Sequence, residues 1–252
     1  MNYQLDNINI YSKSIKELEK DLLNILSSNK SKQIITLNLD FFRNSKFNDE
    51  FRFLCENTEL VLPDGSGITS LIKIKYGKRI KRITGHDLFT LILKISDNKN
   101  LRIALLGSTE NVLSNVKNKI KKGFPKIVIS KMLSPENNFE KDKFKNDLII
   151  KSLMNSKPEI LIVALGSPRQ DLWLKNYKDE IGAKINVGLG SVFDYYSGIK
   201  KRCPLFLQKL KLEWFWRLLS EPARLFRRYI INDLPFYIKE VLKLYKNKRH
   251  II

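Results

Sequence analysis

The stretch Leu62–Gly67, with sequence LPDGSG, combines a carboxylate with two glycines and a serine. An extended apolar run precedes it and an apolar helical pattern follows it, so Asp64 falls at a strand-to-helix junction. Glycines let the backbone turn sharply and approach a ligand closely, and the N–H groups that begin a helix attract anions. An anionic ligand and one carboxylate could therefore share this corner. The alternative is that Pro63-Asp64-Gly65 forms only a turn, because these residue types are common in turns.

The other motif-like positions exclude several kinds of site. Gly188 and Gly190 follow a predicted strand, but the third glycine of a dinucleotide-binding G-x-G-x-x-G would fall at Phe193, so we expect no NAD. The sequence contains no P-loop and no D-x-D pair for a divalent metal. His86 and His250 are far apart and lack metal-ligand spacing; we expect His86 to be a local hydrogen-bonding residue. The sequence thus predicts no cofactor and no metal.

Composition and charge favour an anionic partner. The 252 residues are 43% hydrophobic, which suffices for a sizeable core, and the net charge is +20. Half of this excess lies in residues 200–252, which hold 14 Lys and Arg against 4 Asp and Glu. Two cysteines make no disulfide framework, and no leader or membrane-spanning stretch is visible. We therefore expect a cytoplasmic protein whose partner is nucleic acid, an acidic membrane surface or a phosphorylated substrate.

The order of hydrophobic patterns predicts an α/β fold. Apolar strands alternate with amphipathic helices, which indicates a mostly parallel sheet with helices on both faces. Ligands in such sheets bind beyond the carboxyl ends of the strands, where Asp64 and Gly188–Asp194 fall. Ser14 and Glu17 predict a capping box at the first helix. The predicted strands cover 33–39, 58–62, 101–107, 127–129, 159–165 and 185–190, and the main helices cover 14–28, 48–56, 66–75, 85–95, 108 onward, 141–155 and 170 onward.

The character of the chain changes at Pro204. Large aliphatic and aromatic residues then alternate with lysine and arginine, and Pro222 and Pro235 suit the starts of two further helices. We predict a domain at residues 1–203 and a basic amphipathic helical appendage at residues 204–252. The appendage is interpreted either as a membrane-surface segment or as terminal helices packed on the core with a solvated charged face.

Several stretches, taken in order, resemble the WecG/TagA/CpsF family of glycosyltransferases. The order and spacing agree across about residues 30–230. The matching stretches are TLN at 36–38, LPDGSG at 62–67, RITGHDL at 82–88, LGSPRQDLW at 165–173, VGLGSVFDYYSG at 187–198, KRCP at 201–204 and EWFWRLLSEPARLFRRY at 213–229. Each of these motifs is weak alone, whereas the ordered set is specific.

The resemblance implies a Rossmann-like domain with a C-terminal membrane-proximal appendage. It also implies inverting transfer of an N-acetylmannosamine-type sugar, or its uronic acid, from UDP to a polyprenyl-diphosphate-linked N-acetylglucosamine. The product would enter a teichoic acid, enterobacterial antigen or capsule-like polymer. The enzyme would then work as a peripheral protein on the inner face of the cell membrane, with an anionic membrane surface as a partner.

Carried over residue by residue, the resemblance implies that Asp64 is the catalytic base. Cys203 and Leu189 depart from the family pattern, where a small residue such as alanine and a glycine are expected. The implied substrate-binding residues are Thr36, Asn38 and Gln170 for the sugar, Arg82 for a phosphate, Gly190 and Asp194 for the nucleotide, and Arg217, Arg224 and Arg227 as arginines that close over the site.

The implied chemistry suits these residues. Inverting transfer is a single displacement that needs one base and a means of stabilising the departing diphosphate, so one unpaired carboxylate is enough. Without a metal motif, arginines and helix N-termini must carry the diphosphate charge. Two alternatives are a nucleic-acid-binding protein, which lacks any recognised motif here, and a non-catalytic membrane-docking scaffold. Homo-oligomerisation is left open.

Overall fold

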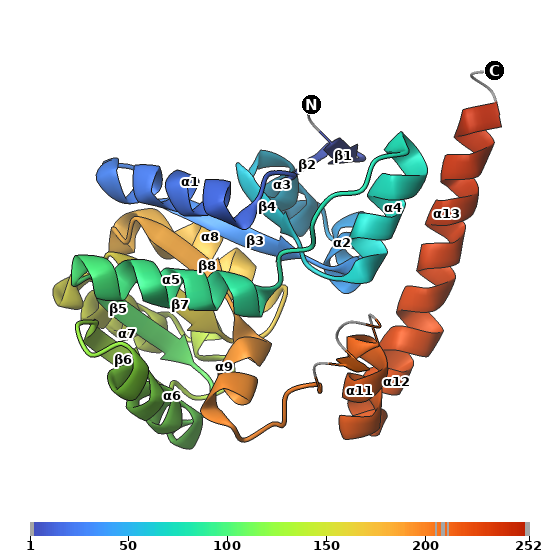
Figure 1. Cartoon of the computed structure of the whole chain (residues 1–252). Coiled ribbons are helices and arrows are strands. Elements are labelled where there is room, and N and C mark those ends of the chain that lie inside the picture. The colour runs from blue at the N-terminus through green and yellow to red at the C-terminus, as the bar shows by residue number, and fades with distance from the viewer. Residues whose placement is uncertain (1–2, 205, 208–209, 211, 250–252) are drawn as a thin grey trace.

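The computed structural model describes residues 3–204, 206–207, 210 and 212–249. Its centre is a six-stranded, fully parallel sheet in the order β4-β3-β8-β7-β5-β6 (Figure 1). The strands are β3 (Lys32–Leu37), β4 (Leu60–Pro63), β5 (Arg102–Gly107), β6 (Val128–Leu133), β7 (Ile160–Ala164) and β8 (Ile185–Gly188). Continuous runs of Ile, Leu and Val make β7 buried at every residue, as expected for a strand covered on both faces. The predicted Rossmann-like architecture is confirmed.

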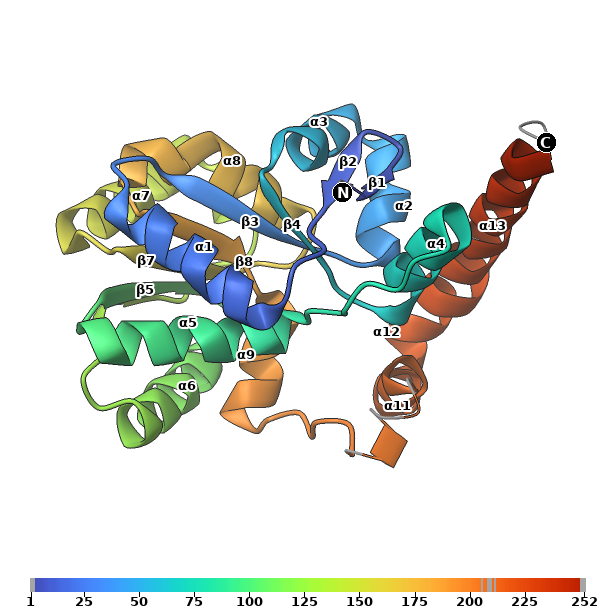
Figure 2. The same cartoon turned by 45° about the horizontal axis from the view of Figure 1, so that its top comes forward.

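Helices cover both faces of this sheet (Figures 1 and 2). The apolar side chains of one face pack with α1 (Ile15–Ser27), α5 (Gly85–Lys99), α6 (Glu110–Gly123) and α9 (Gly190–Ser197). The opposite face packs with α2 (Leu39–Phe47), α3 (Asp49–Asn57), α4 (Ser66–Tyr76), α7 (Lys143–Ser156) and α8 (Arg169–Ile181). The short helix η1 (Phe139–Lys141) precedes α7. The capping box of Ser14 and Glu17 at α1 is present, as predicted.

The structure corrects the end of one predicted strand and adds elements that were not predicted. The strand predicted over 33–39 ends at Leu37, because the Asn38 side chain accepts the Phe41 N–H and caps α2. Thr36 and Asn38 are therefore not alternate residues of one strand. The helices α2 and α9 were not predicted. An antiparallel hairpin of β1 (Tyr3–Leu5) and β2 (Ile8–Ile10) was also missed, since three-residue strands carry little pattern.

The C-terminal segment is helical and lies against the α/β core. It comprises α11 (Glu213–Ser220), α12 (Pro222–Phe226), a π-helix η2 (Arg227–Asp233) and α13 (Leu234–Arg249). Pro222 occupies the first turn of α12, as predicted. The stretch between Pro204 and α11 includes residues 205, 208–209 and 211, which lie outside the described part of the chain. The helix α13 runs alongside α4 (Figures 1 and 2), and Phe236, Tyr237 and Val241 pack on the apolar cluster beneath it.

Candidate active site

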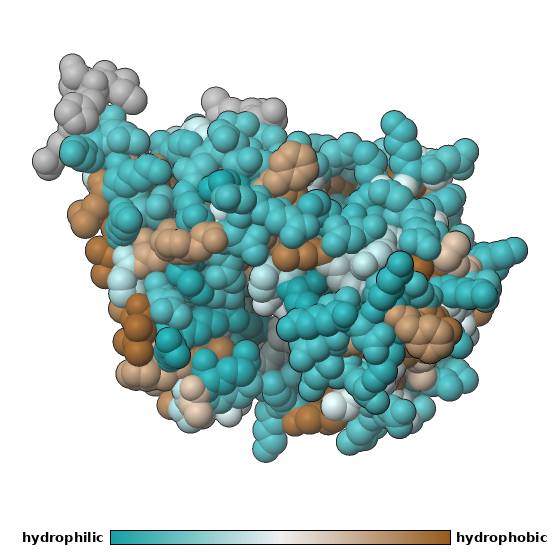
Figure 3. Space-filling view, turned by 180° about the vertical axis from the view of Figure 1, so that it is seen from behind, coloured by the Kyte–Doolittle hydropathy of each residue, from teal (hydrophilic) through white to brown (hydrophobic). Residues whose placement is uncertain are grey.

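The carboxyl ends of β3, β4 and β8 open into a cavity of about 720 Å³. The strand ends contribute Asn38 and Asp64, and the N-terminal turn of α9 contributes Ser191 and Val192. The C-terminal segment closes the opposite wall, and the space-filling view shows a hollow in this surface (Figure 3). The C-terminal segment contributes to this wall the residues Glu213, Trp214, Trp216, Arg217, Arg228, Tyr229, Ile230, Asp233, Leu234 and Tyr237. The cavity thus depends on parts of the chain that are more than 100 residues apart.

Asp64 sits on the floor of this cavity because three elements meet at it. Its backbone N–H donates to the carbonyl of Leu37 at the end of β3 at 2.8 Å, which fixes the end of β4. Gly65 then turns the chain into α4 with φ of +104°, a backbone conformation that residues with a side chain rarely adopt. The Gly85 N–H, at the start of α5, donates to the Asp64 carboxylate. This last contact places the carboxylate at the positive end of a helix.

The charge environment of Asp64 combines burial with two arginines. Burial raises the pKa of Asp64 to about 6, although Arg217 and Arg82 act to lower it. The negative charge of Glu213 raises the pKa of Asp64 and so opposes them; its carboxylate also accepts a hydrogen bond from Arg82 Nη1 at 2.7 Å. A carboxylate with this pKa is largely ionised at neutral pH and accepts a proton more readily than an exposed aspartate.

Arg217 faces the cavity from α11 among aromatic hydroxyls. Its guanidinium lies 5.2 Å from the ring centroid of Tyr195 and donates a hydrogen bond to Tyr229. Burial alone would lower the pKa of Arg217, but Tyr195, Tyr229 and Asp64 together raise it. The arginine is therefore a permanent positive charge beside Asp64, suited to a phosphate oxygen.

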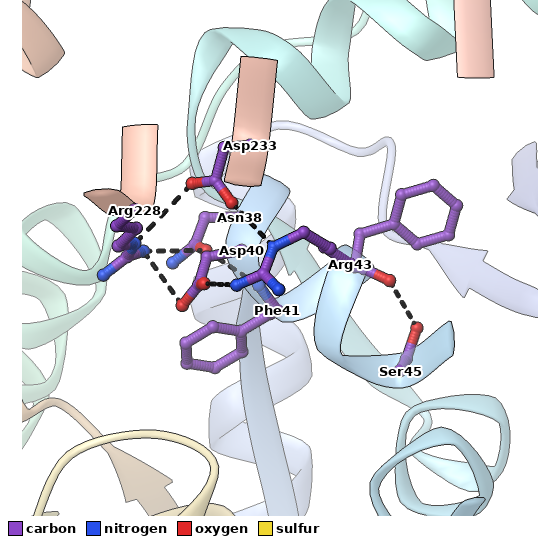
Figure 4. A network of polar contacts seen from close by, with 8 residues as sticks. Asn38, Asp40, Phe41, Arg43, Ser45, Arg228 and Asp233 are labelled. Carbon is purple, nitrogen blue, oxygen red and sulfur yellow. Dashed lines mark hydrogen bonds and ion pairs between the residues drawn. The ribbon is translucent and has the colours of Figure 1, made fainter. Parts of the chain in front are cut away.

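A second group of charges fastens the C-terminal segment to α2 at the cavity wall (Figure 4). Arg43 donates to Asp40 at 2.6 Å and to Asp233 at 3.0 Å. Arg228 pairs with the same two carboxylates, at 3.3 Å and 3.6 Å, and also donates to Asn38 Oδ1 at 3.4 Å. We call Asp40, Arg43, Arg228 and Asp233 the charged cluster. Burial raises the pKa of Asp233, with Arg43 opposing it through a hydrogen bond.

The structure brings together four of the predicted site residues, Asn38, Asp64, Arg82 and Arg217, at the cavity. The other six do not line it, and their roles stay predictions. Thr36 is buried in β3, and Gln170 Oε1 accepts the Gly166 N–H at 3.1 Å and lies close to Gly190. Asp194 forms an ion pair with Lys200 at 2.8 Å, and Arg224 forms one with Glu221 at 2.8 Å. Arg227 is exposed.

Sequence reasoning missed several residues of the cavity wall. Arg228 was not among the predicted site residues, although it lies four positions, about one helical turn, after Arg224, and that spacing was the available signal. His86 was expected to serve as a local hydrogen-bonding residue, yet it lines the cavity next to Gly85. Burial, aided by Arg202, lowers the pKa of His86, so this imidazole is neutral at pH 7. Tyr195 and Glu213 lie within two of the stretches that carry the family resemblance, but neither was among the predicted site residues.

The described part of the chain holds neither a metal-binding cluster nor a membrane-spanning helix. Across residues 3–204, 206–207, 210 and 212–249, no group of three or more His, Cys, Asp or Glu side chains is placed to hold a metal ion. In the same part of the chain, no helix has the length and apolar character needed to cross a membrane.

Comparison with known proteins connects this geometry to an enzyme family. The sequence model described as "Glycosyl transferase WecG/TagA/CpsF family" matches residues 3–250. A Bacillus spizizenii protein named N-acetylglucosaminyldiphosphoundecaprenol N-acetyl-beta-D-mannosaminyltransferase is 33% identical over 219 residues, covering 86% of this chain and 81% of the relative. The Bacillus subtilis protein of the same name is 33% identical over 77% of this chain and 72% of its own length. A Staphylococcus aureus protein of that name is 23% identical over 83% and 79%, respectively.

Proposed function

The chain belongs to the WecG/TagA/CpsF family of glycosyltransferases, and from this premise we propose that it transfers N-acetylmannosamine from a UDP-sugar to polyprenyl-diphosphate-linked N-acetylglucosamine. That it is a glycosyltransferase follows from the family match over nearly the whole chain. The donor and acceptor are proposed from the names of the relatives, which specify the sugar, its β linkage and the lipid-linked acceptor. UDP as the carrier remains the expectation from the family resemblance.

One observation supports the chemistry most directly: the half-buried Asp64 carboxylate lies beside Arg82 and Arg217 in a cavity large enough for a sugar nucleotide. In the proposed reaction, an acceptor hydroxyl attacks the anomeric carbon and gives its proton to Asp64. The bond between the anomeric carbon and the diphosphate breaks, and UDP leaves with the electron pair. Arg217 and Arg82 stabilise the negative charge on the departing diphosphate.

The proposed acceptor is a membrane lipid, and the C-terminal segment has a surface suited to a membrane. Exposed apolar side chains lie along α11, α12, η2 and α13, on a part of the chain that carries much of the positive charge. These include Trp214, Leu219, Phe226, Ile231, Ile238 and Leu242. We propose that the enzyme attaches peripherally to an anionic membrane through this surface, in keeping with the expected cytoplasmic location.

The direct test is to incubate the protein with a panel of UDP-sugars and a short-chain polyprenyl-diphosphate-N-acetylglucosamine. We expect UDP release and a lipid product heavier by one N-acetylhexosamine residue with UDP-N-acetylmannosamine. Turnover with another sugar only would correct the donor, and transfer to no lipid-linked acceptor would overturn the proposed acceptor.

A substitution of Asp64 tests its proposed role as the catalytic base. Asp64→Asn keeps the shape of the side chain but cannot take the proton, so kcat should fall by about 10²–10⁴. Binding of UDP should change little. A variant with a near-normal rate would remove Asp64 from the role of base.

A further inference from the structure

The Asn38 amide has a defined orientation at the cavity wall. Its Oδ1 accepts the Phe41 N–H at 3.1 Å, which caps α2, and accepts a second hydrogen bond from Arg228 Nη2 at 3.4 Å (Figure 4). Both partners are donors, so they identify the oxygen side of the amide without ambiguity. The Nδ2 group, with two N–H donors, has no hydrogen-bond partner among the described residues. Asn38 lines the cavity, so these donors are available to a ligand.

Arg228 differs from Arg217 because it forms ion pairs with two carboxylates. Asp40 and Asp233 both pair with it, and both are themselves held by Arg43. Both carboxylates are at most 9% exposed, and their ion pairs with Nη2 at 3.3 Å and with Nε at 3.6 Å hold the guanidinium beside Asn38. In that position Nη2 reaches Asn38. Arg228 is therefore less free to bind a phosphate than Arg217. Its contact with Asn38 belongs to the same set of interactions that holds the C-terminal segment at the cavity wall.

The π-helix η2 explains how Arg228 and Asp233 can both face α2. Within η2 the Leu234 N–H reaches back five residues to the Tyr229 carbonyl. Arg228 and Asp233 are also five residues apart, a spacing that places side chains on different faces of an α-helix but brings them together across one π turn. Both side chains can therefore face Asp40 on α2.

We propose that Arg228 is a positioning residue for sugar recognition. Through Asn38 Oδ1 it turns the two amide N–H groups toward an acceptor oxygen of the bound sugar, either a hydroxyl or the acetamido carbonyl. The proposal rests on the proposed function for the identity of the ligand as a UDP-sugar. It links the C-terminal segment to the sugar itself, in addition to the diphosphate.

The test compares binding of UDP with binding of UDP-N-acetylmannosamine by calorimetry, so that it does not depend on turnover. Asn38→Asp keeps the cap oxygen and adds an ion pair with Arg228, but it replaces the two donors with an acceptor. We expect its affinity for the UDP-sugar to fall about tenfold, the value of one to two hydrogen bonds, with affinity for UDP unchanged. Its melting temperature should not fall.

Arg228→Gln should show the same selective loss, because only the cap hydrogen bond from the Phe41 N–H then orients the amide of Asn38. Arg228→Lys should recover part of it, since an ammonium can donate to Oδ1 but cannot span both carboxylates. Lys239→Gln removes the same charge from an exposed position of α13 and should leave both affinities unchanged.

Two results would overturn the proposal. Equal loss of UDP and UDP-sugar binding in Arg228→Gln would mean that the arginine only tethers the C-terminal segment, which also carries Arg217. Unchanged UDP-sugar binding in Asn38→Asp would mean that the Nδ2 donors do not contact the sugar. A wild-type protein that binds the UDP-sugar more tightly than UDP but transfers nothing would contradict the proposed function and leave this test intact.

Discussion

At the scale of the residue, the proposed chemistry depends on the environment of one carboxylate. Burial makes the ionised form of Asp64 costly, while the Gly85 N–H, Arg217 and Arg82 favour it. The outcome is a pKa raised to about 6 from an ordinary value of 3.8. A base with this pKa is strong enough to take a proton from a hydroxyl as the bond forms and is still ionised at neutral pH. Burial and the nearby arginines therefore matter as much to the site as the presence of an aspartate.

The pKa of Asp64 predicts the pH dependence of the enzyme. A base must be ionised, so kcat/KM should rise about tenfold per pH unit below pH 6 and level off above it. A pH–rate profile of the wild-type protein, measured with saturating acceptor, checks this. An acid limb near pH 4 would mean that the carboxylate is more exposed to water than its surroundings indicate.

The same pKa also predicts an effect on stability. The folded pKa lies above the unfolded one, so the native state binds more protons between about pH 4 and pH 6, and the free energy of unfolding falls as pH rises through this window. Asp64→Asn removes this pH-dependent fall in the free energy of unfolding. We expect its melting temperature to exceed that of the wild type at pH 7.5 by more than it does at pH 4.5. An identical difference at both values would show that Asp64 does not titrate differently in the two states.

At the scale of the element, the charged cluster decides where the C-terminal segment lies. Asp40 and Arg43 come from α2, and Arg228 and Asp233 come from η2, so the four charges join elements nearly 190 residues apart. Buried charges are stable only when they are paired, and each carboxylate here meets both guanidinium groups. The hydrogen bond between Ser70 Oγ and the Tyr237 hydroxyl, at 2.6 Å, adds a further link between α4 and α13.

Loss of one carboxylate should therefore loosen this segment before it affects the sheet. Asp233→Asn leaves Arg43 and Arg228 to share Asp40, which should cost about 1–3 kcal/mol of local stability, less than for a fully buried pair because the guanidinium groups are partly exposed. Hydrogen exchange of the amides in residues 222–240 should accelerate about tenfold or more, with β5 and β7 unchanged.

The control for this experiment is Asp147→Asn, which removes the same charge from an exposed position of α7. It should leave the exchange of residues 222–240 as in the wild type. Unchanged protection in Asp233→Asn would show that apolar packing of α13 alone holds the segment in place.

At the scale of the whole molecule, the apolar and charged surfaces are unevenly distributed. Exposed apolar side chains recur along the C-terminal helices, and residues 200–252 hold half of the net positive charge. The same segment forms one wall of the cavity. The proposed lipid-linked acceptor and the proposed base, Asp64, would therefore meet where this segment joins the α/β core to the proposed membrane surface.

Vesicle binding should depend on the exposed face of α13. Ile238 and Leu242 are 49% and 64% exposed and lie one helical turn apart. Replacing both with glutamate should weaken binding to anionic vesicles at least tenfold, since it removes apolar burial and adds repulsion. Co-sedimentation with phosphatidylglycerol-containing vesicles measures this.

A matched control comes from α7, where Phe144 and Leu148 have the same spacing and are 72% and 52% exposed. Replacing these two with glutamate should not change vesicle binding. Equal losses in the two double variants would mean that net charge, and not the C-terminal surface, governs the interaction.

The sequence alone determined much of the framework. Its continuous apolar strands, alternating with amphipathic helices, predicted the parallel sheet, because a strand buried on both faces must be apolar throughout. The LPDGSG stretch located Asp64 at a strand end, and the ordered motifs indicated the family that the comparison then confirmed. These are local signals, set by residue type and spacing along the chain.

Only the tertiary structure decided which residues share the cavity. Asn38 and Arg228 are 190 positions apart, and their contact depends on a π turn and on two carboxylates that no local pattern connects. Conversely, Arg224 and Arg227 have the expected residue type but lie outside the cavity wall, because the direction of a side chain on a helix follows from how that helix packs. Long-range packing is a property of the folded chain, so the full set of cavity residues could be identified only there.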